Sequence, residues 1–106
     1  MRIKFTDDAE IDMHDIKKYL NGKAGARTSS KVLTDIKERI NGLMDMPYMG
    51  RKYDDKDEYR IIGAYRYMAF YKVDEENQII EIHRVLHSSR DIEFEMHKEQ
   101  QKHNEI

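Results

Sequence analysis

The sequence predicts a single α+β domain in which one layer of two helices packs on one antiparallel sheet. Apolar residues recur at helical spacing over residues 9–20 and 32–43. Residues 59–87 are instead rich in Tyr, Ile, Phe and Val, which favour strands. The length of 106 residues suits one domain of about 100–150 residues. The predicted order is therefore strand, helix, helix and a three-stranded meander.

The chain is predicted to begin with a strand over residues 2–5, where apolar and basic side chains alternate. Asp7, three residues before Glu10, is the expected N-cap of the first helix. The helix is expected to end at Asn21-Gly22, because glycine accepts the left-handed conformation found at helix ends. Its apolar stripe consists of Ala9, Met13, Ile16 and Leu20.

A second helix is predicted after a small and polar segment, residues 23–30, which we expect to be a loop. The helix is expected to run to about Met46, because Pro47 follows it. Two amphipathic helices joined by a short loop are expected to pair as an antiparallel hairpin. The apolar stripe of the second helix consists of Val32, Ile36, Ile40 and Leu43.

Three strands are predicted in the second half of the chain. Residues 59–62 and 65–73 form the first two, with Gly63-Ala64 as the expected hairpin turn between them. Residues 79–87 form the third strand, and the short connection before it favours antiparallel pairing. Residues 48–58, between the second helix and this meander, are charged and are expected to form a loop.

The net charge of −2 and its distribution limit the function classes. Residues 1–90 contain 17 basic and 16 acidic residues, a net of +1, whereas residues 91–106 contain two lysines and five acids, a net of −3. Proteins whose main partner is a nucleic-acid backbone usually carry a clear basic excess, which this chain lacks. The absence of cysteine excludes a disulfide framework and a thiolate metal site.

The sequence also bears on location and domain limits. No apolar run approaches the roughly 20 residues of a membrane span, and the N-terminus has no apolar signal core. A cytoplasmic protein without membrane contact is therefore expected. We expect residues 1–94 to form the domain and residues 95–106 to form a charged C-terminal tail, because the end of the chain lacks a sustained apolar stripe.

Two histidines of the last predicted strand are candidates for chemistry. His83 and His87 would lie about 13 Å apart at about 3.3 Å per residue, so they cannot share one metal ion. No metal site and no cofactor are predicted. His87 is also a candidate for acid–base work, because histidine exchanges protons near neutral pH. The alternative is a structural histidine at a strand end.

Four arginines lie in or beside the predicted strands. Guanidinium groups match phosphate in two-pronged geometry, so these residues are candidates for an anion site. The alternative is solvated positions or ion pairs with neighbouring acids. Arg84 stands out, because strict alternation places it on one strand face with Ile80, Ile82 and Leu86, where a charge needs a partner or lines a functional surface. The four arginines are Arg60, Arg66, Arg84 and Arg90.

Several short strings occur in a characteristic order over roughly residues 1–94. They are Phe5-Thr6 with Ala9, Asp15-Ile16, Tyr19-Leu20, Pro47 with Gly50-Arg51, Tyr59-Arg60, Tyr65-Arg66, Tyr71-Lys72-Val73 and Arg84-Val85-Leu86-His87-Ser88-Ser89-Arg90-Asp91. Together they resemble the RelE/ParE superfamily, the toxins of bacterial type II toxin–antitoxin systems. The resemblance implies a curved antiparallel sheet packed on an N-terminal two-helix hairpin, in the order β-α-α-β-β-β. It also implies a cognate antitoxin protein as partner, while a homo-oligomer is left open.

The superfamily that the chain resembles divides by target. ParE-like members inhibit DNA gyrase by protein–protein binding and are not nucleases. RelE-like members are endoribonucleases that cut mRNA on the ribosome. For a RelE-like protein the resemblance implies that Arg60 and Arg66 bind the RNA phosphate. The catalytic residues would then be Arg66, Arg84, His87 and Arg90.

Two positions depart from the RelE pattern. Ser88 stands where the resemblance places a catalytic arginine, and Phe94 stands near the position of a C-terminal tyrosine. Phe94 lacks the hydroxyl that acid–base work requires. The ending from Arg84 to Asp91 resembles the ParE side. We therefore expect a ParE-like inhibitor of DNA gyrase, with a RelE-like, ribosome-dependent mRNA endoribonuclease as the alternative.

Overall fold

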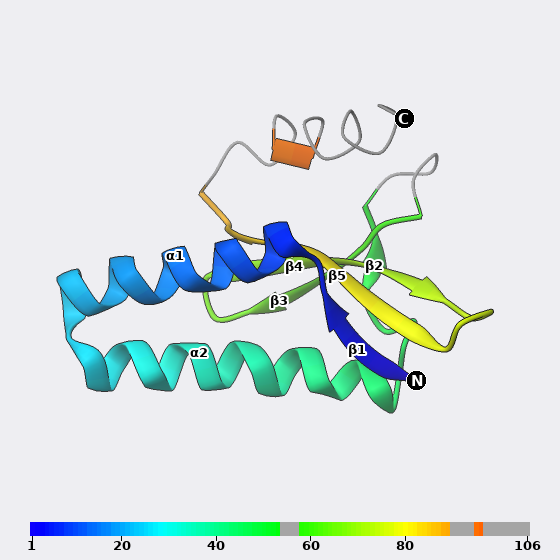
Figure 1. The fold of residues 1–106 in the computed structure, drawn as a ribbon, viewed down its shortest axis with the longest axis horizontal. Coiled ribbons are helices and arrows are strands. Elements are labelled where there is room, and N and C mark those ends of the chain that lie inside the picture. Colours follow the sequence, from blue (N-terminus) through cyan, green and yellow to red (C-terminus); the bar gives the residue numbers. More distant parts are fainter. Residues whose placement is uncertain (54–57, 90–94, 97–106) are drawn as a thin grey trace.

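The computed structural model describes residues 1–53, 58–89 and 95–96, and it forms two helices and a five-stranded sheet (Figure 1). The helices α1 (Asp7–Ala24) and α2 (Ala26–Asn41) lie side by side as an antiparallel hairpin, as predicted. A single 3-10 turn, η1 (Gly42–Met44), follows α2. The strands are β1 (Arg2–Phe5), β2 (Arg51–Lys52), β3 (Arg60–Ala64), β4 (Tyr67–Asp74) and β5 (Ile79–His87).

The sheet is mixed rather than wholly antiparallel. Its strand order is β1-β5-β4-β3-β2; β3, β4 and β5 form the predicted three-stranded antiparallel meander, and β2 extends it at the edge. However, β1 pairs in parallel with β5, from Arg2 opposite Ile79 to Phe5 opposite Ile82. A parallel pair needs a long crossover, which the rest of the fold supplies here. The short strand β2 also lies in a segment that the sequence predicted to be a loop.

The helix ends differ from the predicted ones. Thr6, not Asp7, is the N-cap of α1, and its hydroxyl oxygen accepts a hydrogen bond from the Ala9 N–H at 3.1 Å. The helix passes through Gly22 without ending there and stops before Gly25, which has a φ of 91°. Gly25 alone separates the two helices, so the predicted loop over residues 23–30 is wrong. Packing of the hairpin outweighs the helix penalty of about 1 kcal/mol at Gly22.

The β3–β4 turn lies two residues later than predicted. Ala64 pairs with Tyr67, so Tyr65 and Arg66 form the two-residue turn, and Tyr65 adopts a φ of 60°. Gly63 is instead part of β3, where its carbonyl oxygen accepts a hydrogen bond from Arg39 Nε of α2 at 3.1 Å.

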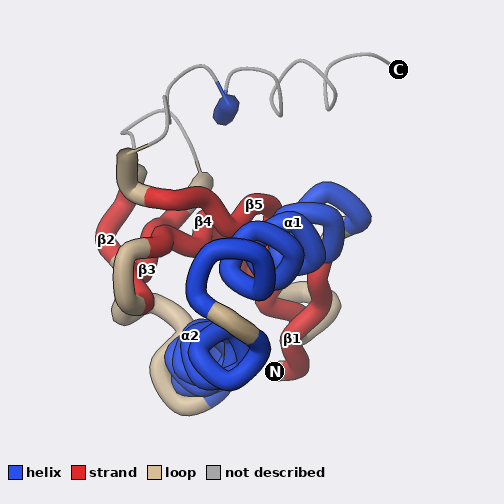
Figure 2. Tube along the Cα trace, turned by 90° about the vertical axis from the view of Figure 1, so that its left-hand side faces the viewer, coloured by secondary structure: helices blue, strands red, loops and turns tan. Residues whose placement is uncertain are grey.

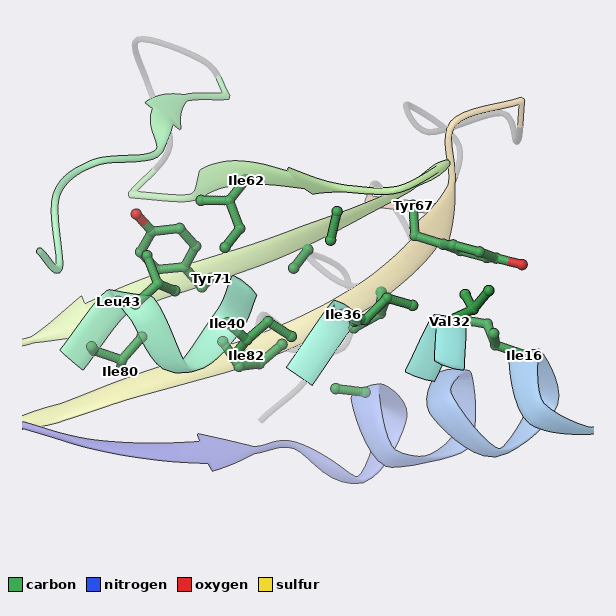
Figure 3. Close-up of a cluster of buried hydrophobic side chains, with 14 residues drawn as sticks. Ile16, Val32, Ile36, Ile40, Leu43, Ile62, Tyr67, Tyr71, Ile80 and Ile82 are labelled. Carbon is green, nitrogen blue, oxygen red and sulfur yellow. The ribbon is translucent and has the colours of Figure 1, made fainter. Parts of the chain in front are cut away.

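The two faces of the sheet carry separate apolar clusters. Figure 3 shows the larger one, in which side chains of α1 and α2 pack against the sheet. On the opposite face lies a smaller cluster that is covered by Met96, and Figure 2 shows residues 95–96 and α2 on opposite sides of the sheet. The smaller cluster consists of Tyr59, Ile61, Phe70, Leu86 and Met96. Glu95 and Met96 belong to the predicted tail, whose residues 97–106 lie outside the described part of the chain.

A β-bulge in β5 separates side chains that strict alternation would place together. Phe70 pairs with Arg84 and Tyr71 pairs with Ile82, so His83 is an extra residue on β5. Ile82 therefore belongs to the helix-side cluster, whereas Leu86 belongs to the opposite one. The predicted common face of Ile80, Ile82, Arg84 and Leu86 is wrong for this reason.

Candidate functional site

A cleft of about 630 Å³ lies between α1 and the end of β5. The helix supplies one wall because its spacing brings residues 12, 15, 16 and 19 to one face. The ends of β4 and β5 supply the other wall. The lining residues are Asp12, Asp15, Ile16, Lys18, Tyr19, Tyr67, Val85, Leu86, His87 and Ser89.

The Asp12 carboxylate joins α1 to the free edge of β5. Because β1 ends opposite Ile82, the rest of β5 has no strand beside it on this edge. Asp12 Oδ2 accepts a hydrogen bond from the Val85 N–H at 2.9 Å, and the Thr6 hydroxyl donates to the His83 carbonyl oxygen at 3.1 Å. These two side chains replace the missing strand by satisfying buried backbone groups.

Arg84 is held by two carboxylates. Its Nε and Nη2 donate to the two oxygens of Asp12 at 2.8 and 3.0 Å, a two-pronged pair, and its Nη1 donates to Glu95 Oε2 at 3.1 Å. The hydrogen bond and charge of Asp12 raise the pKa of Arg84 above its ordinary value, and Glu95 adds to this although burial opposes it. The Arg84 charge is therefore neutralised within the fold.

His87 and three tyrosines gather where β4 and β5 meet α1. The rings of Tyr67 and His87 pack edge to face with centroids 5.2 Å apart. Burial raises the pKa of Tyr67, and the neighbouring phenols of Tyr19 and Tyr65 raise it further. The Ser89 N–H donates to His87 Nδ1 at 3.1 Å, and Ser89 Oγ lies 2.7 Å from the same atom. His87 Nδ1 is thus a local acceptor, which places the proton of the neutral ring on Nε2.

The structure does not bring the three described candidate arginines, Arg60, Arg66 and Arg84, to one place. Arg66 is exposed in the β3–β4 turn beside the end of β5, where its carbonyl oxygen accepts from the Ser88 N–H at 2.9 Å. Arg60 lies at the other end of β3, six residues away, which is about 20 Å along a strand. Its Nη1 donates to the carbonyl oxygens of Gly50 at 2.8 Å and Tyr48 at 3.3 Å. Arg90 lies outside the described residues.

A second buried polar group lies on the sheet face opposite the helices. The His83 ring, 1 % exposed, has its Nδ1 3.4 Å from the Tyr59 hydroxyl and its Nε2 2.6 Å from Glu81 Oε1. Lys72 Nζ lies 4.4 Å from the centre of the Tyr59 ring. Both rings are closed off from solvent, and Tyr59 is itself part of the smaller cluster.

Neither a metal cluster nor a membrane helix occurs in the part of the chain that the structure describes. No three His, Asp or Glu side chains there are placed to hold a metal ion. No helix there is long and apolar enough to span a membrane.

Comparison with known proteins supplies the family. The family described as the ParE toxin of type II toxin–antitoxin systems, parDE, matches residues 3–92. The chain belongs to the ParE toxin family. No curated protein sequence matches this ParE-family chain.

Solved structures share the fold of this ParE-family chain. One from the chromosomal ParDE system of P. aeruginosa has 21 % identity and a TM-score of 0.72, covering 82 % of this chain and 95 % of its own. One from the RelBE2 toxin–antitoxin complex of Mycobacterium tuberculosis has 21 % identity and a TM-score of 0.62, covering 81 % of this chain and 95 % of its own. One from the intact E. coli RelBE complex has 14 % identity and a TM-score of 0.57, covering 83 % of this chain and 96 % of its own.

Sequence reasoning missed the central residue of the site in this ParE-family protein. Asp12 is only 8 % exposed although it is charged. Its position offered a signal, because it stands three residues after Ala9 and four before Ile16, within the apolar stripe of α1. A carboxylate on an apolar helix face requires a buried partner. That partner is Arg84, a charged residue for which the sequence also predicted either a partner or a place on a functional surface.

Proposed function

We propose that the chain is a ParE-like toxin that inhibits DNA gyrase through a protein–protein contact. One observation carries the proposal: among the described residues, the candidate arginines for RNA cleavage lie far apart or are paired with carboxylates. Arg84 is paired with Asp12 and Glu95, and Arg60 is bound to loop carbonyls about 20 Å from Arg66. Stabilising a phosphate in a transition state requires donors that converge on it within about 3 Å.

The surface around the cleft fits a protein partner. Tyr19 and Tyr65 are 56 % and 68 % exposed, and Ile11 is exposed further along α1. Exposed tyrosines beside a pocket commonly act as anchor residues in protein interfaces. The cleft, which Tyr19 lines, can accept a side chain of the partner. We therefore place the target-binding surface on α1 and the end of the sheet.

We further propose that a cognate antitoxin protein binds this chain and that the pair acts in the cytoplasm. Support comes from structures of the same fold, whose names describe toxin–antitoxin complexes. An antitoxin segment would have to cover the target-binding surface or compete for it. The described structure contains an exposed cleft and an exposed edge at β2, and either can accept a peptide segment.

The decisive experiment measures gyrase activity with purified toxin. We expect toxin in excess over gyrase, without antitoxin, to abolish supercoiling of relaxed plasmid, and we expect Tyr19→Ala to raise the toxin concentration needed by at least about tenfold, as for an anchor residue. A matched control is Tyr48→Ala, an exposed tyrosine remote from the cleft lining. Supercoiling that is unaffected by excess toxin would exclude this function.

A second function has one observation in its favour. The structure places Arg66 and His87 at the same end of the sheet, where the resemblance to RelE expected a phosphate-binding and an acid–base residue. If the protein is an mRNA endoribonuclease, toxin expression produces codon-phased cuts detected by primer extension. Arg66→Ala and His87→Ala would then each remove cleavage and toxicity. We expect neither result, and full toxicity of both variants would reject the nuclease.

A further inference from the structure

The tip of the helical hairpin is strongly basic although the chain as a whole is acidic. Residues 16–34 contain five basic residues and no acid, a net charge of +5, so the remaining residues carry −7 of the total of −2. All five side chains are exposed. We call these residues the basic tip: Lys17, Lys18, Lys23, Arg27 and Lys31. The small net charge of the whole sequence therefore conceals a concentration of positive charge in residues 16–34.

The fold gathers these charges from both helices. The Ser29 hydroxyl of α2 donates to the Lys17 carbonyl oxygen of α1 at 3.3 Å, so the two helices bring Lys17 level with the first turns of α2. The hairpin turn extends beyond the sheet, and the acidic β4–β5 turn, with Glu75 and Glu76, lies at the other end of the long axis (Figure 1). The hairpin end of the molecule is thus positive, and the acidic β4–β5 turn is remote from it.

Helix stability does not explain the basic tip. Arg27 lies in the first turn of α2, where the helix dipole disfavours a cation and where acidic residues are absent. Arg27 and Lys31 are four residues apart on one helix, a spacing at which like charges repel. Within the described residues, Lys17, Lys18 and Arg27 form no salt bridge. Helix stability thus accounts for Lys23, which lies in the last turn of α1, but not for Lys17, Lys18 and Arg27, whose exposed charges are available to bind an anion.

We propose that the basic tip binds the phosphate backbone of double-stranded DNA, namely the DNA held by the inhibited topoisomerase. The choice of DNA over an acidic protein rests on the proposed function and on two features of the tip. Four of its five cations are lysines, which are depleted in the cores of protein interfaces. The tip is also a projecting helix end, which can approach a duplex backbone without a matching groove (Figure 1).

The tip adjoins the surface proposed to bind the target. Lys18 lines the cleft together with Tyr19, and Lys23 donates to the Tyr19 hydroxyl at 3.0 Å. Exposed Arg66 lies at the same end of the sheet. One toxin molecule can therefore contact the enzyme through the cleft and the duplex through the tip. Two contacts linked in this way strengthen each other by effective concentration.

Fluorescence anisotropy with a labelled DNA duplex of about 20 base pairs tests the proposal directly. With four or five phosphate contacts, the affinity is expected to fall on the order of 10²-fold between about 50 and 200 mM salt. Reversing three tip charges that lie outside the cleft lining, Lys17→Glu with Arg27→Glu and Lys31→Glu, should weaken binding by at least about tenfold and reduce the salt slope by about 3. Circular dichroism verifies that the variant is folded.

The control variant has the same total charge but an intact tip. It carries Lys4→Glu, Lys37→Glu and Lys52→Glu, all at exposed positions outside the basic tip. We expect it to bind DNA like the unmodified protein. Equal loss in both variants, or no binding at the lower salt concentration, overturns the proposal. Tighter binding to a glutamate-rich peptide or to duplex RNA overturns it as well, because the tip would then serve another partner.

Supercoiling assays with the same proteins separate this proposal from the gyrase function. We expect the tip variant to need at least about tenfold more toxin for inhibition, as for the loss of one of two linked contacts, and the control variant to act normally. If the toxin inhibits gyrase but does not bind DNA, the proposed gyrase function stands and the proposed DNA-binding site at the basic tip is rejected. If the toxin binds DNA through the basic tip but does not inhibit gyrase, the proposed DNA-binding site stands and the proposed gyrase function is rejected.

Discussion

Replacing Asp12 with alanine is expected to lower the free energy of unfolding by about 3–5 kcal/mol, the range found when one partner of a buried ion pair is removed. Asp12 is 8 % exposed and accepts two hydrogen bonds from Arg84 and one from the Val85 N–H. Its loss leaves the Arg84 charge with Glu95 alone. It also leaves a buried N–H at the free edge of β5 without its acceptor.

Urea denaturation followed by circular dichroism measures this effect. The matched control is Asp15→Ala, which removes an exposed carboxylate from the same helix and should change stability by less than about 0.5 kcal/mol. Asp12→Asn should fall between the two, because its amide oxygen can still accept from Val85. A loss below about 1 kcal/mol for Asp12→Ala would mean that the pair adds no more than an exposed ion pair does.

Gly50→Ala is expected to destabilise the protein by about 3 kcal/mol, because it overpacks a closed site. A Cβ atom there would lie 2.6 Å from the Tyr71 hydroxyl oxygen and 2.8 Å from the Ile61 carbonyl oxygen. The Tyr71 hydroxyl cannot move freely, since it accepts from the Gly50 N–H at 3.0 Å and donates to the Pro47 carbonyl oxygen at 2.8 Å. The loop that carries Gly50 would have to detach from β3 and β4.

Thermal and urea unfolding of matched glycine variants test this prediction. Gly63→Ala serves as the control, because a Cβ at Gly63 meets no atom within 4 Å and the strand backbone there is ordinary. We expect it to be neutral or slightly stabilising, by up to about 1 kcal/mol. Tyr71→Phe should lose about 1–3 kcal/mol by removing the hydroxyl that the loop uses. Similar unfolding midpoints for the two alanine variants would contradict the close-packing argument.

Local patterns in the sequence predicted the type and order of the regular elements except β2. The bounds predicted for β1 and β5 agree with the structure, because apolar and basic residues alternate in β1 and β-branched residues are frequent in β5. The helical hairpin was also predicted from its apolar stripes. Its ends were not, because glycine has the same local preference at Gly22 and Gly25, and only packing between the helices decides which one adopts the positive φ.

Features that depend on long-range contacts could not be predicted from the sequence. The parallel pairing of β1 with β5 and the bulge at His83 depend on segments that are distant along the chain. The bulge moved Leu86 to the opposite face, so alternation alone misplaced the surroundings of Arg84. The partner of Arg84 is on α1, 72 positions away in sequence, and no local rule connects the two. Candidate residues were therefore recognised by type, but their partners required the fold.

The pairing of β1 with β5 also determines when a newly made chain can finish folding. Residues 2–5 of β1 pair with residues 79–82 of β5, near the other end of the domain. Contacts between such distant segments form late, since closing the intervening loop must come first. A nascent polypeptide therefore cannot complete this sheet before β5 has been synthesised, and the ion pair between Asp12 and Arg84 has to wait for the same event.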